Sequence, residues 1–281
     1  MFTFQVTTMK VIFVNAAQWQ PSREEFLAAL HQLHSKDSVR CATEEGQREL
    51  SNCPLPQHTK AVKSRLLARH LLVQQLLNPG DSSSPLPMRK KSQVLLPTTL
   101  YGKPLTMDAK PGDFSVSHEP NWVCCAYTAS GTIGVDITPI RSEDCKLLGN
   151  ILSQREADAL RYRAVSLQPP CFALYWSLKE CVLKALGLGL STSLQMHDIT
   201  LEFDVDAETL ARMRLSAGSR IDSFTQPLKV TIRGSHNAGW AFSYALIEDD
   251  PLHLICVVKQ GEDGGNKVEW RFQSCESVLR C

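Results

Sequence analysis

One segment in the middle of the chain places apolar side chains on nearly every side of a helix. It reads PPCFALYWSLKECVLKALGLG and covers residues 169–189. At 100° per residue only a narrow stripe of this helix is polar, so the rest of the protein must enclose it. Pro169 and Pro170 at its start and Gly187 and Gly189 at its end are typical helix boundary signals. We therefore predict a buried helix of about four turns.

Two charged residues, Glu180 and Lys184, stand out in this apolar segment. Together with Ser177 they fall within about 60° of one another around the helix axis, so acid and base share one stripe. An ordinary ion pair on a solvated face would explain them and would contribute a few tenths of a kcal/mol. Burying these charges requires compensation by a partner, a metal ion or a ligand. We interpret the stripe as one wall of a cleft.

The composition is that of an ordinary globular protein without a general field for attracting polyanions. The 281 residues are 43% hydrophobic and 21% charged, with a formal net charge of +1 at pH 7. This length allows one large domain or two of modest size. We expect no nucleic-acid partner, and no membrane partner because no apolar run approaches the roughly 18 residues of a membrane span. An anionic ligand would need locally placed cations.

Neither the N-terminal sequence nor the cysteines indicate an oxidising or organellar compartment. The first fifteen residues, MFTFQVTTMKVIFVN, lack a charged start with a long apolar core and contain no arginine. Ten cysteines occur without a Cys-x-x-Cys pair, and several lie within apolar runs, so we expect reduced core residues. The expected location is the cytoplasm.

The remaining periodicities predict two groups of helices and strands. Residues 10–17 have the pattern of a buried strand, and residues 21–33 that of an amphipathic helix with a proline at its start. A leucine-rich helix is predicted over 59–77. Alternating residues between turn signals then predict strands over 113–138 and again after 199.

This order of elements suggests two similar α/β halves joined near residues 129–131. We predict an α/β (α+β) fold of two halves, each a small β-sheet packed with helices. Residues 1–129 would form the first half, and residues 130–250 the second half with the candidate acidic ligands. Residues 251–281 form a tail with one more possible strand, and the sequence assigns it no role.

Three short motifs add candidate functional residues to the helix. YGKPL, residues 101–105, places Lys103 in a tight turn where a cation and backbone amides can meet a phosphate. FSVSH places Ser117 and His118 at the end of a strand, and GVDIT turns Asp136 away from its apolar neighbours. Each motif alone is common. Two carboxylates and several cations together are what a magnesium-bound diphosphate requires.

In this order, GKPL, FSVSH, GVDI and WSLKECVLKALGLGL resemble the signature of the 4'-phosphopantetheinyl transferases of the large, monomeric surfactin-synthetase type. The resemblance covers roughly residues 95–195. It is greatest to the cytosolic broad-range members, which include those that activate aminoadipate-semialdehyde dehydrogenase of lysine metabolism and fatty-acid synthase. It implies two pseudo-symmetric halves with coenzyme A bound between them, and a monomer.

The resemblance also implies a reaction and its residues. A magnesium-dependent enzyme would move the phosphopantetheine arm of coenzyme A to a serine of an apo acyl or peptidyl carrier protein domain and release 3',5'-ADP. Asp136 and Glu180 would hold Mg²⁺, Glu180 would be the general base, and Lys184 would lie on the diphosphate and assist the leaving group. Further candidate contacts to coenzyme A are Arg48, Thr98, Tyr101, Gly102, Lys103, Ser115, Ser117 and His118.

Several positions depart from the family pattern. Thr138 stands where bacterial members often carry a third acidic ligand, Ser115 where many have asparagine, and Leu174 where many have arginine. Thr98 occupies a position that is often basic. Arg48, the candidate contact to the 3'-phosphate of coenzyme A, is placed only by its spacing ahead of SRLLARHLL. These differences concern the affinity for magnesium and coenzyme A.

Two alternatives remain open at this stage. The same carboxylates and cations suit another magnesium-dependent phosphoryl-transfer enzyme, although no Gly-x-x-x-x-Gly-Lys-Ser/Thr loop is present. A catalytically inactive module that binds coenzyme A or a carrier protein would keep the fold without turnover. The basic residues between Lys60 and Arg69 are a candidate surface for the carrier.

Overall fold

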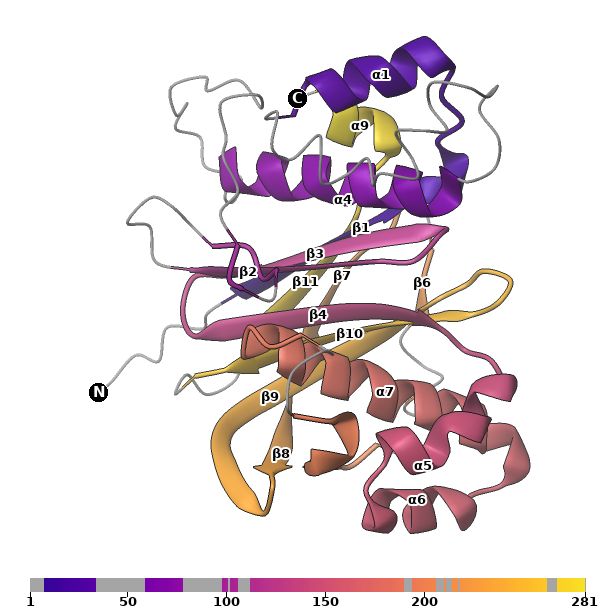
Figure 1. Ribbon diagram of the computed structural model, residues 1–281, viewed down its shortest axis with the longest axis vertical. Helices are drawn as coiled ribbons and strands as arrows, with labels where there is room; N and C mark the ends of the chain where they lie inside the picture. The colour runs from indigo at the N-terminus through magenta and orange to yellow at the C-terminus, as the bar shows by residue number, and fades with distance from the viewer. Residues whose placement is uncertain are drawn as a thin grey trace.

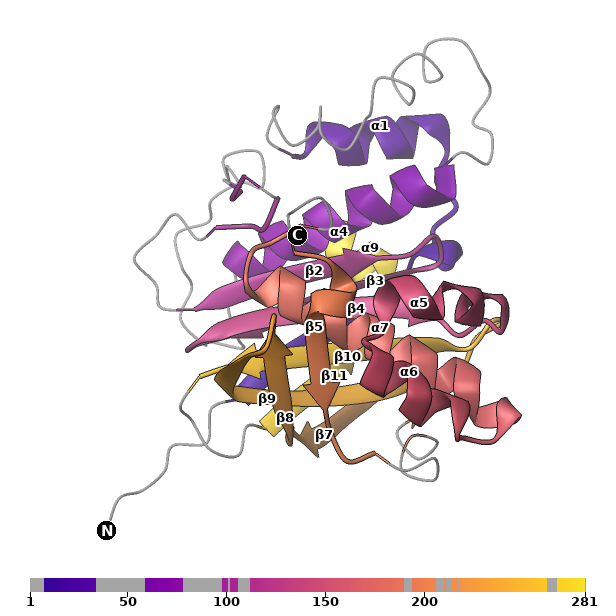
Figure 2. The same ribbon diagram turned by 60° about the horizontal axis from the view of Figure 1, so that its bottom comes forward.

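The computed structural model describes residues 8–33, 59–77, 98–100, 102–105, 112–189, 194–205, 210, 214–216, 218–261 and 267–280. These residues form four layers, with helices outside two β-sheets that pack face to face (Figures 1 and 2). The predicted α/β fold of two small sheets, each packed with helices, is confirmed. No helix of the described residues is long and apolar enough to cross a membrane.

The first sheet carries its helices on one face. Its strands follow the order β2 (Asp113–His118), β3 (Trp122–Thr128), β1 (Thr8–Asn15), β11 (Lys267–Phe272) and β7 (Arg220–Phe224). The helices are α1 (Arg23–His31), α4 (Thr59–Leu77) and α9 (Cys275–Arg280). Leucines of α4 pack with Phe114 and Val123 of the sheet in one buried cluster. The helix predicted over 59–77 is therefore present and is held by its apolar face.

The second sheet is arranged in the same way with its helices on the opposite side of the molecule. Its strands follow the order β4 (Thr132–Pro139), β10 (His253–Gln260), β9 (Ser235–Ile247), β8 (Gln226–Ile232) and β5 (Ile199–Glu202), and β6 (Arg214–Leu215) pairs with β9. The helices are α5 (Leu148–Ile151), α6 (Gln154–Arg161) and α7 (Gln168–Ala185). Short 3-10 turns lie at Ala16–Gln18, Glu143–Leu147, Val165–Leu167 and Met196–Asp198.

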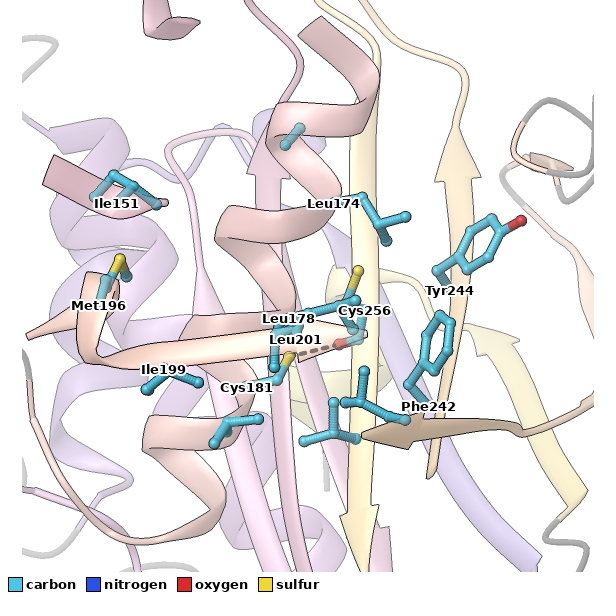
Figure 3. Close-up of a cluster of buried hydrophobic side chains, with 14 of the residues drawn as sticks. Ile151, Leu174, Leu178, Cys181, Met196, Ile199, Leu201, Phe242, Tyr244 and Cys256 are labelled. Carbon is cyan, nitrogen blue, oxygen red and sulfur yellow. Dashed lines mark hydrogen bonds between the residues drawn. The ribbon is translucent and has the colours of Figure 1, made fainter. Parts of the chain in front are cut away.

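Helix α7 is the predicted apolar helix, and it is buried as expected. It packs on β4 and β10 and shares a cluster with residues such as Leu201, Phe242 and Cys256 (Figure 3). Pro169 and Pro170 occupy its first turn, where the missing amide hydrogens cost nothing. Twelve of its residues, including Ser177 and Glu180, are buried.

The C-terminal segment contributes to both sheets. Strand β10 lies between β4 and β9, whereas β11 lies between β1 and β7 in the other sheet. Trp270 of β11 is fully buried between the sheets with Phe13 and Val135. The segment beyond residue 250, to which the sequence assigned no role, is thus part of the central core.

Candidate active site

The two sheets meet along their edge strands β2 and β4, and side chains join them there. Asp113, Ser115 and Ser117 alternate along β2 on the side that faces β4. Asp113 Oδ2 accepts a hydrogen bond from the Ile133 amide at 2.7 Å, and Ser115 Oγ accepts one from the Val135 amide at 3.0 Å. Amides of an edge strand that would otherwise lack a partner are satisfied in this way. This joint places the end of β2 beside Asp136.

Asp136 is held in a fixed orientation by two serines. Val135 and Ile137 point into the core between the sheets, so Asp136 points to the opposite face, toward α7. Its side chain is almost fully buried. Ser117 Oγ donates to Oδ1 at 2.9 Å, and Ser177 Oγ of α7 donates to Oδ2 at 2.8 Å. Each carboxylate oxygen therefore has a hydroxyl donor from a different element.

Helix α7 can approach β4 closely because residue 134 is glycine. A Cβ atom on Gly134 would lie 1.8 Å from the carbonyl oxygen of Cys181, well inside any allowed contact. The Cys181 thiol of α7 also donates a hydrogen bond to the backbone carbonyl of Cys256 at 3.2 Å (Figure 3). Cys256 lies in β10, the strand next to β4. The glycine two residues before Asp136 thus lets the helix bring Glu180 and Lys184 to that carboxylate.

Lys184 pairs with Asp136 and not with the acid one turn away on its own helix. Its Nζ atom lies 2.6 Å from Asp136 Oδ1, 2.8 Å from Ser117 Oγ and 3.2 Å from the Val135 carbonyl oxygen. Burial by itself lowers the pKa of Lys184, but the charges of Asp136 and Glu180 outweigh burial and raise it. The ammonium is therefore charged at physiological pH.

Glu180 is a buried carboxylate without a counter-ion of its own. Its side chain is 9% exposed, and it makes no hydrogen bond or ion pair with another residue in the described part of the chain. Burial and then repulsion by Asp136 raise its pKa to about 7, although Lys184 opposes this shift. A second cation beside Asp136 would offset the free-energy cost of ionising Glu180.

The donor set fits a hard divalent cation such as Mg²⁺. Two buried carboxylates from β4 and α7 supply oxygen ligands, and that of Glu180 has no other partner in the part of the chain that the structure describes. Within the described ranges, no group of three or more His, Cys, Asp or Glu side chains is arranged as a metal site. Magnesium usually keeps waters or takes phosphate oxygens beside one or two carboxylates, so two protein ligands are sufficient.

The Gly-Lys-Pro turn lies against the C-terminal end of α7. Thr98 pairs with Pro104, and Gly102, at φ +87°, donates its amide to the Thr99 carbonyl at 3.0 Å. The Lys103 ammonium contacts Asp113 and donates to the Ala185 carbonyl at 2.8 Å. A cation at a helix C-terminus interacts favourably with the helix dipole. Lys103 thus ties the turn, β2 and α7 together.

His118 lies on the other face of β2 from Ser117, toward α4. Its Nδ1 atom is 3.4 Å from the hydroxyl of Ser64, which is fully buried. Burial, followed by the charges of Arg65, Lys184 and Arg69, lowers the pKa of His118 to about 4. The imidazole is therefore neutral at physiological pH.

The candidate residues fall into three groups. Asp136, Glu180, Lys184 and Ser117 come together, with His118 at the adjoining strand end. Ser115 and Lys103 have their polar atoms engaged in joining structural elements, and Thr98 and Gly102 form the turn beside α7. Arg48 and Tyr101 lie outside the described residues.

Sequence reasoning missed two supporting residues on α7. Ser177 was assigned to the polar stripe but without its role as a donor to Asp136. Lys179 was overlooked, although it is fully buried and its Nζ lies 2.6 Å from Glu156 Oε2 and 2.8 Å from the Ile151 carbonyl. Lys179 lies in the same apolar segment as Glu180, so the sequence already indicated a buried charge that needs a partner.

Comparisons with known proteins show which family the chain belongs to. A family model described as the 4'-phosphopantetheinyl transferase superfamily matches residues 132–244, which include Asp136, Glu180 and Lys184. A phosphopantetheinyl transferase of Thraustochytrium sp. is 30% identical over 226 residues, covering 74% of this chain and 69% of that protein. The chain belongs to the 4'-phosphopantetheinyl transferase superfamily.

Other relatives of the transferase match over different lengths. The 4'-phosphopantetheinyl transferase Sfp of Bacillus subtilis is 32% identical over 114 residues, which cover 41% of this chain and 50% of that protein. The L-aminoadipate-semialdehyde dehydrogenase-phosphopantetheinyl transferase of Rattus norvegicus is 24% identical over 268 residues, which cover 91% of this chain and 76% of that protein. The similarity to the rat protein thus extends through both sheets.

Proposed function

We propose that this transferase moves the 4'-phosphopantetheine arm of coenzyme A to a serine of an apo acyl or peptidyl carrier protein domain and releases 3',5'-ADP. Membership of the superfamily supports this reaction class. The observation that carries the assignment to this site is the buried carboxylate of Glu180, which lies beside Asp136 and Lys184 and has no hydrogen-bond partner among the described residues. A general base and a cation one helical turn apart suit an in-line displacement at phosphorus.

The reaction forms a bond from the serine oxygen to the β-phosphorus of coenzyme A and breaks the bond from that phosphorus to the bridging oxygen. The serine proton passes to Glu180, a buried carboxylate that has no hydrogen-bond donor of its own among the described residues. The leaving oxygen on 3',5'-ADP is stabilised by the charge of Lys184, which can also give it a proton. Glu180 then returns its proton to solvent.

Asp136 and Glu180 would hold Mg²⁺, and the ion would neutralise charge on the diphosphate oxygens. The serine donors Ser117 and Ser177 keep the Asp136 carboxylate in place for this role. The Lys184 ammonium lies 2.6 Å from the Asp136 carboxylate and would share that carboxylate with the ion. Its contacts to Ser117 and the Val135 carbonyl hold Lys184 beside the position proposed for the diphosphate.

The resemblance to the cytosolic broad-range members supports the proposed setting and the order in which carriers are tested. We place the reaction in the cytoplasm, expect a monomer, and expect no nucleic acid or membrane partner. The match to the rat relative makes a carrier domain of the aminoadipate-semialdehyde dehydrogenase type the first acceptor to test, followed by that of fatty-acid synthase. These acceptors connect the activity with lysine and fatty-acid metabolism.

Intact-mass spectrometry of a purified apo carrier domain tests the proposal. The carrier is incubated with the protein, coenzyme A and Mg²⁺, with EDTA in a parallel sample and Glu180→Gln as a matched variant. A gain of one phosphopantetheine that requires metal and Glu180 supports the reaction. No gain on several carriers, while coenzyme A still binds, would favour the inactive binding module.

A further inference from the structure

The turn between β2 and β3 carries one more acidic side chain toward Asp136. Glu119 follows directly after β2, and its amide donates to the Trp122 carbonyl at 2.8 Å while the Trp122 amide donates back at 3.3 Å. These hydrogen bonds extend the β2–β3 pairing by one residue pair, so the alternation of side chains continues to Glu119. Glu119 therefore faces the same side as Ser117, whose hydroxyl donates to Asp136 at 2.9 Å.

Charges from the second half of the molecule surround Glu119. Asp136 of β4 and Lys184 of α7 act on its charge, and so do Arg141 and Asp144 in the segment that follows β4. Burial and then repulsion by Asp136 raise the pKa of Glu119, whereas the charges of Arg141 and Lys184 oppose this shift. Glu119 belongs to the first sheet and yet lies within electrostatic range of the carboxylate at the centre of the candidate site.

The Glu119 carboxylate has no direct partner among the described residues. It is partly buried, and it makes no hydrogen bond or ion pair in the part of the chain that the structure describes. Glu180, whose side chain is 9% exposed, also has none within those ranges. Two unpaired carboxylates near Asp136 are costly in a site that is largely removed from water, unless a cation binds there.

The formal charges show what Glu119 changes. Asp136 and Glu180 carry two negative charges, whereas Mg²⁺ and the Lys184 ammonium carry three positive ones. A metal-bound site without coenzyme A would therefore keep one net positive charge, and Glu119 neutralises it. When coenzyme A is bound, the diphosphate oxygens supply negative charge instead.

We propose that Glu119 is a third acidic residue of the magnesium site, where it accepts a hydrogen bond from a water molecule that the ion retains. This inference rests on the proposed function, which places Mg²⁺ at Asp136 and Glu180. Contact through water fits the described residues, because no group of three His, Cys, Asp or Glu side chains among them is arranged to ligate one ion directly. Magnesium gives up its waters reluctantly, so a further carboxylate can act through its hydration shell.

Thr138 offers a second position for a carboxylate at the same site. It lies two residues after Asp136, so it is on the same side of β4, and it is half-buried. Thr138→Glu would bring a negative charge to the ion from β4 instead of from the β2–β3 turn. This substitution can therefore replace the charge of Glu119 without restoring its side chain.

Binding of Mn²⁺ tests the role of Glu119. Mn²⁺ takes the same oxygen ligands as Mg²⁺, and electron paramagnetic resonance measures the free ion. Glu119→Gln should weaken Mn²⁺ binding about tenfold without coenzyme A, as is typical for groups that support metal ligands, and by a smaller factor with coenzyme A bound. Adding Thr138→Glu should restore most of the affinity. Glu143→Gln is the matched control at an exposed glutamate after β4, and it should leave both affinities unchanged.

Thermal melts in EDTA distinguish this role from a purely structural one. Because the ionised Glu119 carboxylate is unfavourable in the metal-free protein, Glu119→Gln should melt at the wild-type temperature or above it. A lower melting temperature would overturn the inference in favour of a role in the β2–β3 turn, and an unchanged Mn²⁺ affinity would overturn it outright.

Neither measurement requires a carrier or turnover. Weaker Mn²⁺ binding by Glu119→Gln in a protein that transfers nothing would support the third acidic residue while refuting the proposed reaction. Unchanged Mn²⁺ binding by Glu119→Gln in an active transferase would refute only the role of Glu119.

Discussion

Gly134 of β4 and Cys181 of α7 are in direct backbone contact, since a Cβ atom on the glycine would lie 1.8 Å from the Cys181 carbonyl oxygen. Gly134→Ala must therefore push α7 away from β4 and move Glu180 and Lys184 away from Asp136. We expect a loss of stability of about 1–3 kcal/mol, the usual cost of overpacking, and a larger relative loss of transfer activity.

Thermal melts and carrier-modification rates check this prediction, with Gly149→Ala as the control. Gly149 lies in α5, and a Cβ atom there would have nothing within 4 Å. Alanine at that position should leave stability unchanged or slightly raised. Wild-type activity in Gly134→Ala would show that close packing of α7 on β4 is not what positions the acidic residues.

The sequence predicts those features of the site that depend on residues close together along the chain. The burial of α7 follows from its own apolar pattern, and the direction of Asp136 follows from alternation along one strand. Both properties are local. The pairing of Lys184 with Asp136 joins residues 48 positions apart. The motifs predict that both residues belong to one site, but not that the ammonium contacts this carboxylate.

Other features depend on strand pairing that no local pattern determines. Ser115 was a candidate contact to coenzyme A, but its hydroxyl accepts the Val135 amide because β2 lies beside the edge of β4. The strand near residue 270 was visible in the sequence, but its insertion between β1 and β7 was not. The order of strands in the two sheets determines both the hydrogen bond of Ser115 and the position of β11.

The raised pKa of Glu180 predicts a specific pH dependence of stability. Burial and repulsion by Asp136 shift its pKa from 4.5 to about 7, so the folded protein retains a proton that the unfolded chain releases. The contribution of Glu180 to the stability of the metal-free protein should fall as pH rises from about 4.5 through 7, by an amount on the order of 1–3 kcal/mol. His118, whose pKa is lowered to about 4, contributes the opposite slope, so the contribution of Glu180 is the difference between wild type and Glu180→Gln. Urea unfolding in EDTA between pH 5 and 8 measures this slope.

Glu180→Gln should remove this contribution, because the neutral amide does not titrate, so the unfolding free energy of the wild type relative to the variant should fall as pH rises. Saturating Mg²⁺ should also flatten this pH dependence in the wild type, since a bound cation favours the ionised carboxylate. Identical slopes in wild type and variant, with EDTA, would show that Glu180 does not titrate in this range.

Ser177→Ala tests how firmly Asp136 must be held. The substitution removes the 2.8 Å hydrogen bond to Oδ2 from a fully buried hydroxyl. Loss of a partner that orients a metal ligand typically weakens metal affinity 10- to 100-fold, so we expect half-saturation by Mg²⁺ to shift by about tenfold or more. Rates at saturating Mg²⁺ should recover much of the loss. Ser142→Ala, at an exposed serine, should leave the magnesium titration unchanged, and so would Ser177→Ala if its hydroxyl only fills space.

Lys179 supports α7 from the side opposite the acidic site. Its buried ammonium lies 2.6 Å from Glu156, which also accepts the Leu201 amide at 2.7 Å. Lys179→Met leaves the Glu156 carboxylate buried without a cation, and we expect a destabilisation of about 3–5 kcal/mol. Lys229→Met breaks an exposed pair with Glu202 at 3.7 Å and should cost less than about 1 kcal/mol.

Adding Glu156→Gln to Lys179→Met should recover part of the loss, because the amide oxygen can still accept from Leu201 without carrying a charge. Denaturant unfolding of the wild type and the three variants measures these differences in unfolding free energy. Similar losses for Lys179→Met and Lys229→Met would contradict a role for the buried pair in holding α7.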